Sequence, residues 1–300
     1  MSPNTNPVDR ASTTNTEPLI TRKATRSGIP NLRQYLAEVW RYRAFAYHWS
    51  KADVKARNFE TFLGRLWHYV NPVLFGFIYF VFVGIISGGG LTDAERLALI
   101  VGNLYLWVFF SSVIISGTTS VSSGTAGITA QSSIPRVILP MASMITAANL
   151  FVRSMLAYIP FHLLAGRGLY PQMLWIPLLA VLTALFGFGI SLIFAVVNVY
   201  IRDISRLLPH LTRLWMYLSP VIWSYTRIFA PDVPDAVRRW AEVNPMFSGM
   251  AAWTMALGGV RAPEPTMASQ VLIFAGWAVA AGVIGFLFFV SREDEFAIRG

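Results

Sequence analysis

Long segments without charged side chains are the feature that most limits what this chain can form. Residues 173–200 contain none, and comparable apolar segments recur along most of the chain. Apolar residues make up 55% of the 300 residues and charged residues only 13%, about half the share in a soluble protein. Segments of about 20 apolar residues can cross a bilayer as helices. The sequence therefore predicts an all-α polytopic membrane protein.

Six membrane-spanning helices are expected, within one transmembrane domain over residues 68–290. Their approximate ranges are 69–87, 97–119, 137–165, 173–200, 208–228 and 268–290. Pro220 interrupts the fifth span, because proline removes a backbone hydrogen-bond donor. Gly187 and Gly189 in the fourth span permit the close approach of a neighbouring helix.

The segments outside the spans differ from one another in composition. Residues 1–29, rich in Pro, Thr, Asn and Ser, are predicted to form a disordered cytoplasmic tail. Residues 30–67 are predicted to form an amphipathic interfacial region, with one helix over 30–62 that starts at Pro30 and Asn31. An ordinary amphipathic helix docked on protein is the alternative. Residues 291–300 are expected to be a short cytoplasmic tail.

The positions of the basic residues indicate an orientation. Most of the 24 Lys and Arg residues lie on one side of the membrane if the N-terminus is cytoplasmic, with Arg136, Arg202 and Arg292 on that same side. Both termini are then cytoplasmic. The net charge of +9 is better explained by basic residues facing anionic lipid than by nucleic-acid binding, for which no fold motif is present.

The longest external segment, about 229–267, is unusually apolar. It predicts two short helices broken at Asn244 and Pro245, because proline disfavours helical geometry in the residue before it. These helices are expected to gate the external mouth, either by re-entering the membrane or by packing on the spans. A plain surface cap is the alternative. The expected gate residues are Trp240, Asn244, Pro245, Phe247 and Trp253.

The sequence contains no motif typical of a catalytic centre. The Gly-rich P-loop, the Gly-x-Ser-x-Gly elbow and the His-Glu-x-x-His pattern are all missing. There are no cysteines, and the four histidines are too scattered for a metal site. We therefore expect a conduit with no catalytic residue, metal or cofactor of its own.

Polar and aromatic side chains inside the spans are candidates for a substrate pathway. Arg153 is the one charged residue well inside a predicted span, and Asn149 lies one turn before it. They would contact an anionic or sugar substrate, unless Arg153 pairs with a backbone carbonyl or snorkels to the surface. Sugar rings stack on aromatic faces, although aromatic side chains also fill membrane cores. The expected channel residues are Phe75, Tyr79, Tyr105, Phe109, Asn149, Arg153 and Tyr217.

Four motifs occur in order along residues 50–250. The first comprises Asp53, Lys55, Arg57, Phe59, Leu63, Gly64, Trp67 and Pro72. The others are Ile-Pro-Arg-Val-Ile-Leu-Pro at 134–140, Val-Tyr-Ile-Arg-Asp-Ile at 199–204 leading to Leu-Ser-Pro-Val-Ile at 218–222, and Asn-Pro-Met at 244–246. Together they resemble the permease subunit of ABC-2 type exporters that move O-antigen, teichoic acid or galactan. Ile134 and Val137 stand where that family usually has Phe and Glu.

The resemblance implies a homodimer of this subunit, in contact with membrane lipids and with two separate ABC ATPase subunits that bind the ATP and Mg. It implies export of a lipid-linked polysaccharide across the bacterial inner (plasma) membrane. The residues that would couple the permease to the ATPase are Lys55, Arg57, Gln131, Pro135, Arg136, Arg202 and Asp203. The alternatives are an ABC-2 exporter of a drug or lipid and, from a different class, a membrane scaffold or a glycosyltransferase-like enzyme.

Overall fold

The computed structural model describes residues 31–56, 94–122, 134–258 and 265–293, with a few isolated positions between 66 and 81. Every regular element within this part of the chain is a helix. In chain order they are α1 (Leu32–Arg41), α2 (Arg43–Ala56), α4 (Ala94–Thr119), α6 (Ile138–Leu164), the 3-10 helix η2 (Pro171–Trp175), α7 (Ile176–Tyr200), α8 (Ile204–Leu218), the 3-10 helix η3 (Tyr225–Phe229), α9 (Asp235–Val243), α10 (Pro245–Ala256) and α11 (Met267–Arg292).

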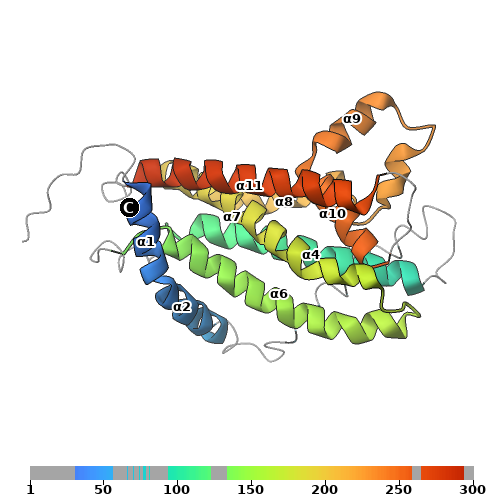
Figure 1. Ribbon diagram of the computed structural model, residues 1–300, viewed down its shortest axis with the longest axis horizontal. Coiled ribbons are helices and arrows are strands. Elements are labelled where there is room, and N and C mark those ends of the chain that lie inside the picture. Colours follow the sequence, from blue (N-terminus) through green and yellow to red (C-terminus); the bar gives the residue numbers. More distant parts are fainter. Residues whose placement is uncertain are drawn as a thin grey trace, which may run out of the picture.

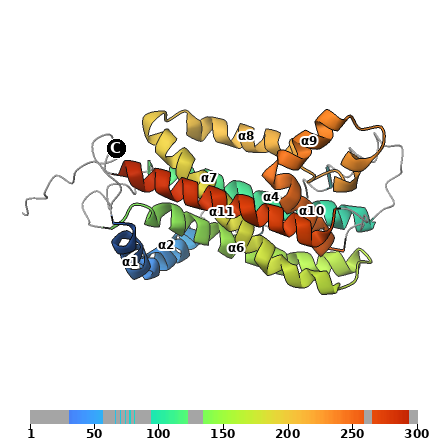
Figure 2. The same cartoon turned by 45° about the horizontal axis from the view of Figure 1, so that its top comes forward.

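Four long helices form the body of the molecule and lie side by side (Figures 1 and 2). α4, α6, η2 with α7, and α11 are each long and apolar enough to cross a membrane. They confirm the second, third, fourth and sixth expected spans, so the chain is a multi-pass membrane protein. The first expected span, at 69–87, and the tail at 1–29 lie outside the described residues, apart from the isolated positions.

α4 is the central helix of the bundle. It packs against α6 and α7, and α7 in turn packs against α11. Most of α4 is therefore buried, whereas most of α6 and α11 faces outward. The ring of Phe110 on α4 stacks on Phe186 of α7 with 5.6 Å between ring centroids. Van der Waals packing in this apolar core holds the spanning helices together.

Glycine lets α7 and α11 pack backbone to backbone. A Cβ atom at Gly189 would overlap the backbone of Ala281, and one at Gly285 would overlap the backbone of Gly189. A Cβ atom at Gly187 would press on Val113 of α4 at 3.2 Å. Small residues allow this approach between membrane helices, where dispersion contacts dominate packing. The close packing expected at Gly187 and Gly189 is confirmed.

The expected fifth span, at 208–228, is not one helix. α8 ends at Leu218 after 15 residues, and Ser219 is extended because it precedes Pro220. The chain then turns and re-forms only the short η3. At about 1.5 Å per residue α8 reaches about 22 Å, short of the roughly 30 Å hydrocarbon core.

The N-terminal helix is also divided, contrary to the single helix expected over 30–62. α1 begins after Asn31, whose side chain accepts a hydrogen bond from the backbone of Arg33, as the sequence predicts. It ends at Arg41, and the guanidinium of Arg43 donates to the carbonyl of Trp40 at 2.9 Å. The break lets α1 face the end of α11 while α2 packs along α6.

The tight contact between α7 and α11 yields a stability prediction. Gly189→Ala should lower the thermal unfolding midpoint of the detergent-solubilised protein, because overpacking of this kind costs about 1–3 kcal/mol. Tryptophan fluorescence during heating would measure it. Gly276→Ala on α11 is the control, since nothing lies within 4 Å of its added Cβ. Equal midpoints for the two variants would show that this contact does not hold the bundle.

Candidate functional site

One end of the bundle joins α1, the start of α6 and the end of α11 (Figure 1). The Tyr35 hydroxyl donates to Glu293, and the backbone N–H of Arg136 donates to the other oxygen of the same carboxylate. Burial, with the negative Glu293 beside it, raises the pKa of the Tyr35 hydroxyl well above its usual range. A tyrosine hydroxyl is protonated at neutral pH in any case, and the raised pKa keeps it a donor in alkaline solution as well. A single carboxylate thus ties three helices together.

The expected coupling residues that the structure describes lie at or near this end. Pro135 and Arg136 lead directly into α6 beside Glu293, and Lys55 lies in the last turn of α2. Arg57 and Gln131 lie outside the described residues.

Arg202 and Asp203, also expected coupling residues, are exposed in the turn between α7 and α8, where Asp203 pairs with Arg206 at 3.5 Å. Asn198 fixes this turn. Its amide donates to Ser122 at 2.7 Å, and its side-chain oxygen accepts from the backbone of Ser205 at 3.1 Å.

Asn244 organises the opposite end of the bundle. Its side-chain oxygen accepts from the backbone of Met246 at 3.1 Å and from the indole of Trp215 at 2.9 Å. Its amide nitrogen donates to the carbonyl of Leu218 at 3.3 Å and to the hydroxyl of Ser219 at 3.1 Å. The residue thus caps α10 and anchors it to the end of α8. The break between two short helices expected at Asn244 and Pro245 is present.

α10 is part of the core and not a surface cap. Trp253 is fully buried, and its indole donates to the carbonyl of Gly102 on α4 at 3.1 Å. Phe247 is also buried and lies against Trp223 and Phe229. Trp240 on α9, by contrast, is 46% exposed. The two helices therefore differ: α10 is held inside the bundle, and α9 lies on its surface.

The expected channel residues occupy different environments. Tyr105 and Phe109 are buried between α4 and α6, where Phe109 stacks on Phe151 with 4.5 Å between ring centroids. Tyr217 on α8 is 44% exposed. Phe75 and Tyr79 lie outside the described residues. In this conformation Tyr105 and Phe109 serve the core, and their part in a channel stays a prediction.

Asn149 and Arg153 lie on the outward side of α6. Arg153 is exposed, and no hydrogen bond or ion pair joins its guanidinium to any other described residue. Asn149 is half-buried and donates to the carbonyl of Ile145 in its own helix at 2.9 Å. Apolar side chains surround them on this face, including Val152, Leu156 and Ile159. α6 thus presents one cationic and one amide group in an otherwise apolar surface.

A buried arginine lies directly after α6 and belongs to none of the motifs identified in the sequence. Arg167 is only 7% exposed. Its guanidinium pairs with Glu95 at 3.4 Å and donates to the carbonyl of Gly258, which has a positive φ of 76°. This contact joins the ends of α4, α6 and α10. In the sequence, this contact is indicated only by a charged residue directly after a predicted span and by a glycine far along the chain.

The comparisons with known proteins bear on the identity of the chain. It is 26% identical to the O-antigen export system permease protein RfbA of Myxococcus xanthus, over 87% of this chain and 96% of that protein. Two proteins of the same name from Klebsiella pneumoniae are 27% and 29% identical, over 67% of this chain and 75% of theirs. No family model matches the chain.

The chain is a homologue of O-antigen export permeases. The longest match covers 87% of this chain and nearly the whole of the Myxococcus xanthus permease. The resemblance inferred from four short motifs is confirmed by this match.

The hydrogen bonds of Asn244 predict a large effect of mutation in this permease homologue. Asn244→Ala should lower the thermal unfolding midpoint strongly, because it removes a cap and leaves the buried hydroxyl of Ser219 and the part-buried indole N–H of Trp215 unpaired, at about 1–3 kcal/mol per group. Asn31→Ala is the matched control, since it removes one exposed helix cap of about 1 kcal/mol. Similar midpoint shifts for the two variants would contradict the anchoring role.

Proposed function

We propose that this chain is the permease subunit of an ABC exporter, and that it moves a lipid-linked cell-surface polysaccharide out of the cytoplasm. Energy comes from a separate ATPase subunit, which holds the ATP and Mg. The observation that carries this proposal is the homology to proteins named O-antigen export permeases along most of the chain. Four membrane-length helices and the lack of any P-loop in the sequence agree with it.

We place both termini in the cytoplasm and the chain in a bacterial inner membrane. The end of the bundle formed by α1, the start of α6 and the α7–α8 turn is rich in basic residues. They include Arg33, Arg41, Arg43, Arg136, Arg202, Arg206 and Arg292. Basic residues flanking spans remain on the cytoplasmic side during insertion. The end of the bundle that carries α9 and α10 then lies on the side of the membrane opposite the cytoplasm.

Motion of the ATPase would enter at this basic end. α1 is amphipathic, and Tyr35 joins it through Glu293 to the end of α11 and the start of α6. A displacement of α1 or of the Pro135–Arg136 segment therefore moves two spanning helices together. This arrangement suits a coupling element, because a rigid contact transmits a shift that a flexible loop would absorb.

A second copy of the chain would pack against the outward side of α6. An arginine facing lipid at mid-span costs about 2.5–3.5 kcal/mol on insertion scales, so Arg153 needs water or a protein partner. A homodimer with a channel along α6 supplies both. Asn149 and Arg153 would then contact the polysaccharide, while α9 and α10 control its exit.

The first test concerns energy supply and cargo. The chain purified alone should hydrolyse no ATP above a blank, whereas the complex isolated from native membranes should hydrolyse it. Depletion of the chain in its host should trap lipid-linked polysaccharide on the cytoplasmic side, measured by lipid extraction and surface lectin binding. Re-expression of the wild-type chain is the control. Unchanged surface glycan after depletion would overturn the proposal.

The second test concerns Arg153. Because the chain has no natural cysteine, a thiol reagent reacts only with the cysteine that is introduced. Arg153→Cys in the assembled exporter should react with a membrane-impermeant thiol reagent, because the site is expected to open to water. Ile284→Cys, on the exposed apolar side of α11, is the control and should react only with a lipid-soluble reagent. Identical labelling of the two positions by the lipid-soluble reagent alone would place Arg153 against the bilayer.

A further inference from the structure

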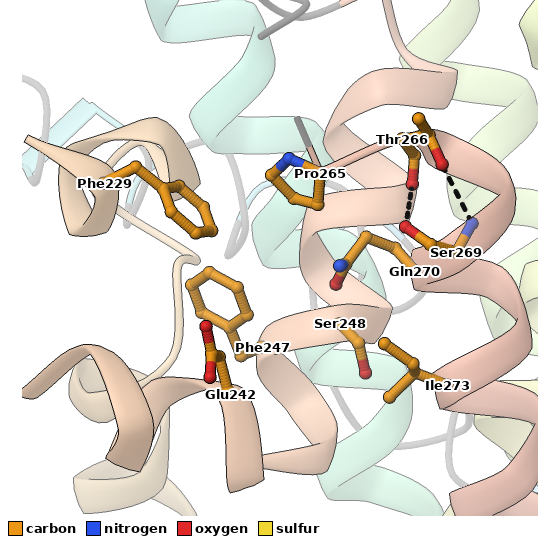
Figure 3. Close-up of a pocket in the computed structure, with 9 residues that line it drawn as sticks. All are labelled: Phe229, Glu242, Phe247, Ser248, Pro265, Thr266, Ser269, Gln270 and Ile273. Atoms are coloured by element: carbon orange, nitrogen blue, oxygen red, sulfur yellow. Dashed lines mark hydrogen bonds between the residues drawn. The ribbon is translucent and has the colours of Figure 1, made fainter. Parts of the chain in front are cut away.

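A pocket of about 560 Å³ lies between η3, α9, α10 and the start of α11 (Figure 3). It is beside the Asn244 hinge, on the side of α10 that faces away from α4. Its volume falls in the range of small-molecule sites, which is about 300–1,000 Å³. Nothing in the proposed transport function so far uses this pocket.

Gln270 is the first sign that the pocket receives a ligand. It lies in the first turns of α11, is only 7% exposed and lines the pocket. Its side-chain oxygen is buried, and no other described residue donates a hydrogen bond to it. A buried polar atom without a partner costs about 1–3 kcal/mol, so such atoms usually mark a missing partner. That partner is expected to be a hydrogen-bond donor.

Other polar groups of the pocket add acceptors, while the side-chain nitrogen of Gln270 and the hydroxyl of Thr266 can donate. The hydroxyl of Ser248 donates its proton to the carbonyl of Pro245 at 2.9 Å, so only its lone pairs remain for a ligand. Glu242 contributes an exposed carboxylate. No Lys, Arg or His is among the described residues that line the pocket. A ligand with several hydroxyl groups, which can both donate and accept hydrogen bonds, matches these side chains.

Aromatic rings form the opposite wall. Phe229 and Phe247 lie across the pocket from Gln270 (Figure 3), with 6.4 Å between ring centroids and 65° between ring planes. The ring centroid of Trp223 lies 6.3 Å from that of Phe247. Such rings offer a flat apolar surface. A pyranose has the matching shape, with a C–H face that packs on an aromatic ring and hydroxyls around its edge that donate.

We propose that this pocket binds one neutral sugar unit of the exported polysaccharide as it leaves the membrane domain. The assignment rests on the proposed function for its cargo, and on Gln270, Glu242 and the two rings for its chemistry. The sugar hydroxyls donate to the oxygens of Gln270 and Glu242, and its C–H face packs on Phe229. Because Phe247 and Ser248 belong to α10, occupancy of the pocket bears directly on the position of that helix.

The test is ligand-observed saturation-transfer NMR on the full-length chain in phosphatidylcholine nanodiscs. The probes are the methyl glycosides of glucose, galactose, mannose and N-acetylglucosamine, with phosphoethanolamine as the lipid-headgroup probe. At least one glycoside should receive saturation from the protein, and phosphoethanolamine should neither receive it nor displace the sugar. Gln270→Met, Glu242→Gln and Phe229→Leu should each weaken glycoside binding about tenfold, as expected for the loss of one contact.

Two variants outside the pocket serve as controls for the loss of a carboxylate or a glutamine as such. Asp235→Asn removes an exposed carboxylate of α9 outside the pocket, and Gln172→Met removes a glutamine with a buried, unpartnered oxygen elsewhere. Both should bind the glycosides as the wild type does, and thermal unfolding midpoints would verify that all the variants fold.

The proposal is overturned if no glycoside gives a signal above empty nanodiscs, if the pocket variants bind normally, or if phosphoethanolamine displaces the sugar. Export by the native complex is measured separately. Normal export together with absent glycoside binding would refute the sugar site alone. Glycoside binding by a chain whose depletion leaves surface glycan unchanged would refute the transport function alone.

Discussion

The side chain of Asn103 on α4 makes the two hydrogen bonds on which the segment from the end of α8 to α10 depends. Its amide nitrogen donates to the carbonyl of Val221 at 3.2 Å, and its oxygen accepts from Thr254 of α10 at 3.1 Å. Inside a membrane, a turn can exist only where protein groups satisfy its backbone. One asparagine in the central helix therefore permits the chain to break after α8 and holds α10 beside that break. The Asn244 hinge and the pocket next to it are built on this arrangement.

Apolar length predicted the long helices well, because a membrane helix needs little beyond about 20 apolar residues. It failed where a local break competes with that signal. The segment 208–228 was predicted to be a span, yet Pro220 ends the helix and Asn103 stabilises the break from more than a hundred positions away in sequence. No proline or glycine, the usual helix-breaking residues, lies at the division between α1 and α2. It follows from the two different surfaces that these helices cover.

The candidate sites, too, could be predicted only where local sequence rules determine them. Asn244 and Pro245 could be identified as a break from local rules, whereas the contacts with Trp215 and Ser219 depend on tertiary structure. Tyr105 and Phe109 matched the composition of a sugar channel but fill the space between α4 and α6, because aromatic side chains serve both purposes. Arg167 belongs to no sequence motif, and only the structure shows that it is buried and pairs with Glu95. The sequence shows which polar and aromatic side chains a chain has, whereas tertiary packing determines which of them are free to contact a substrate.

α11 connects the two functional ends. Its N-cap Thr266 lies beside the Gln270 pocket, and its C-cap Glu293 accepts hydrogen bonds from Tyr35 and Arg136. At about 1.5 Å per residue its 26 residues span about 39 Å, the full height of the hydrocarbon core. Backbone contact at Gly189 and Gly285 locks it to α7, so the pair resists bending between its ends. Glu293 and Gln270 therefore lie at opposite ends of one helix that is packed tightly against α7, with no loop between them.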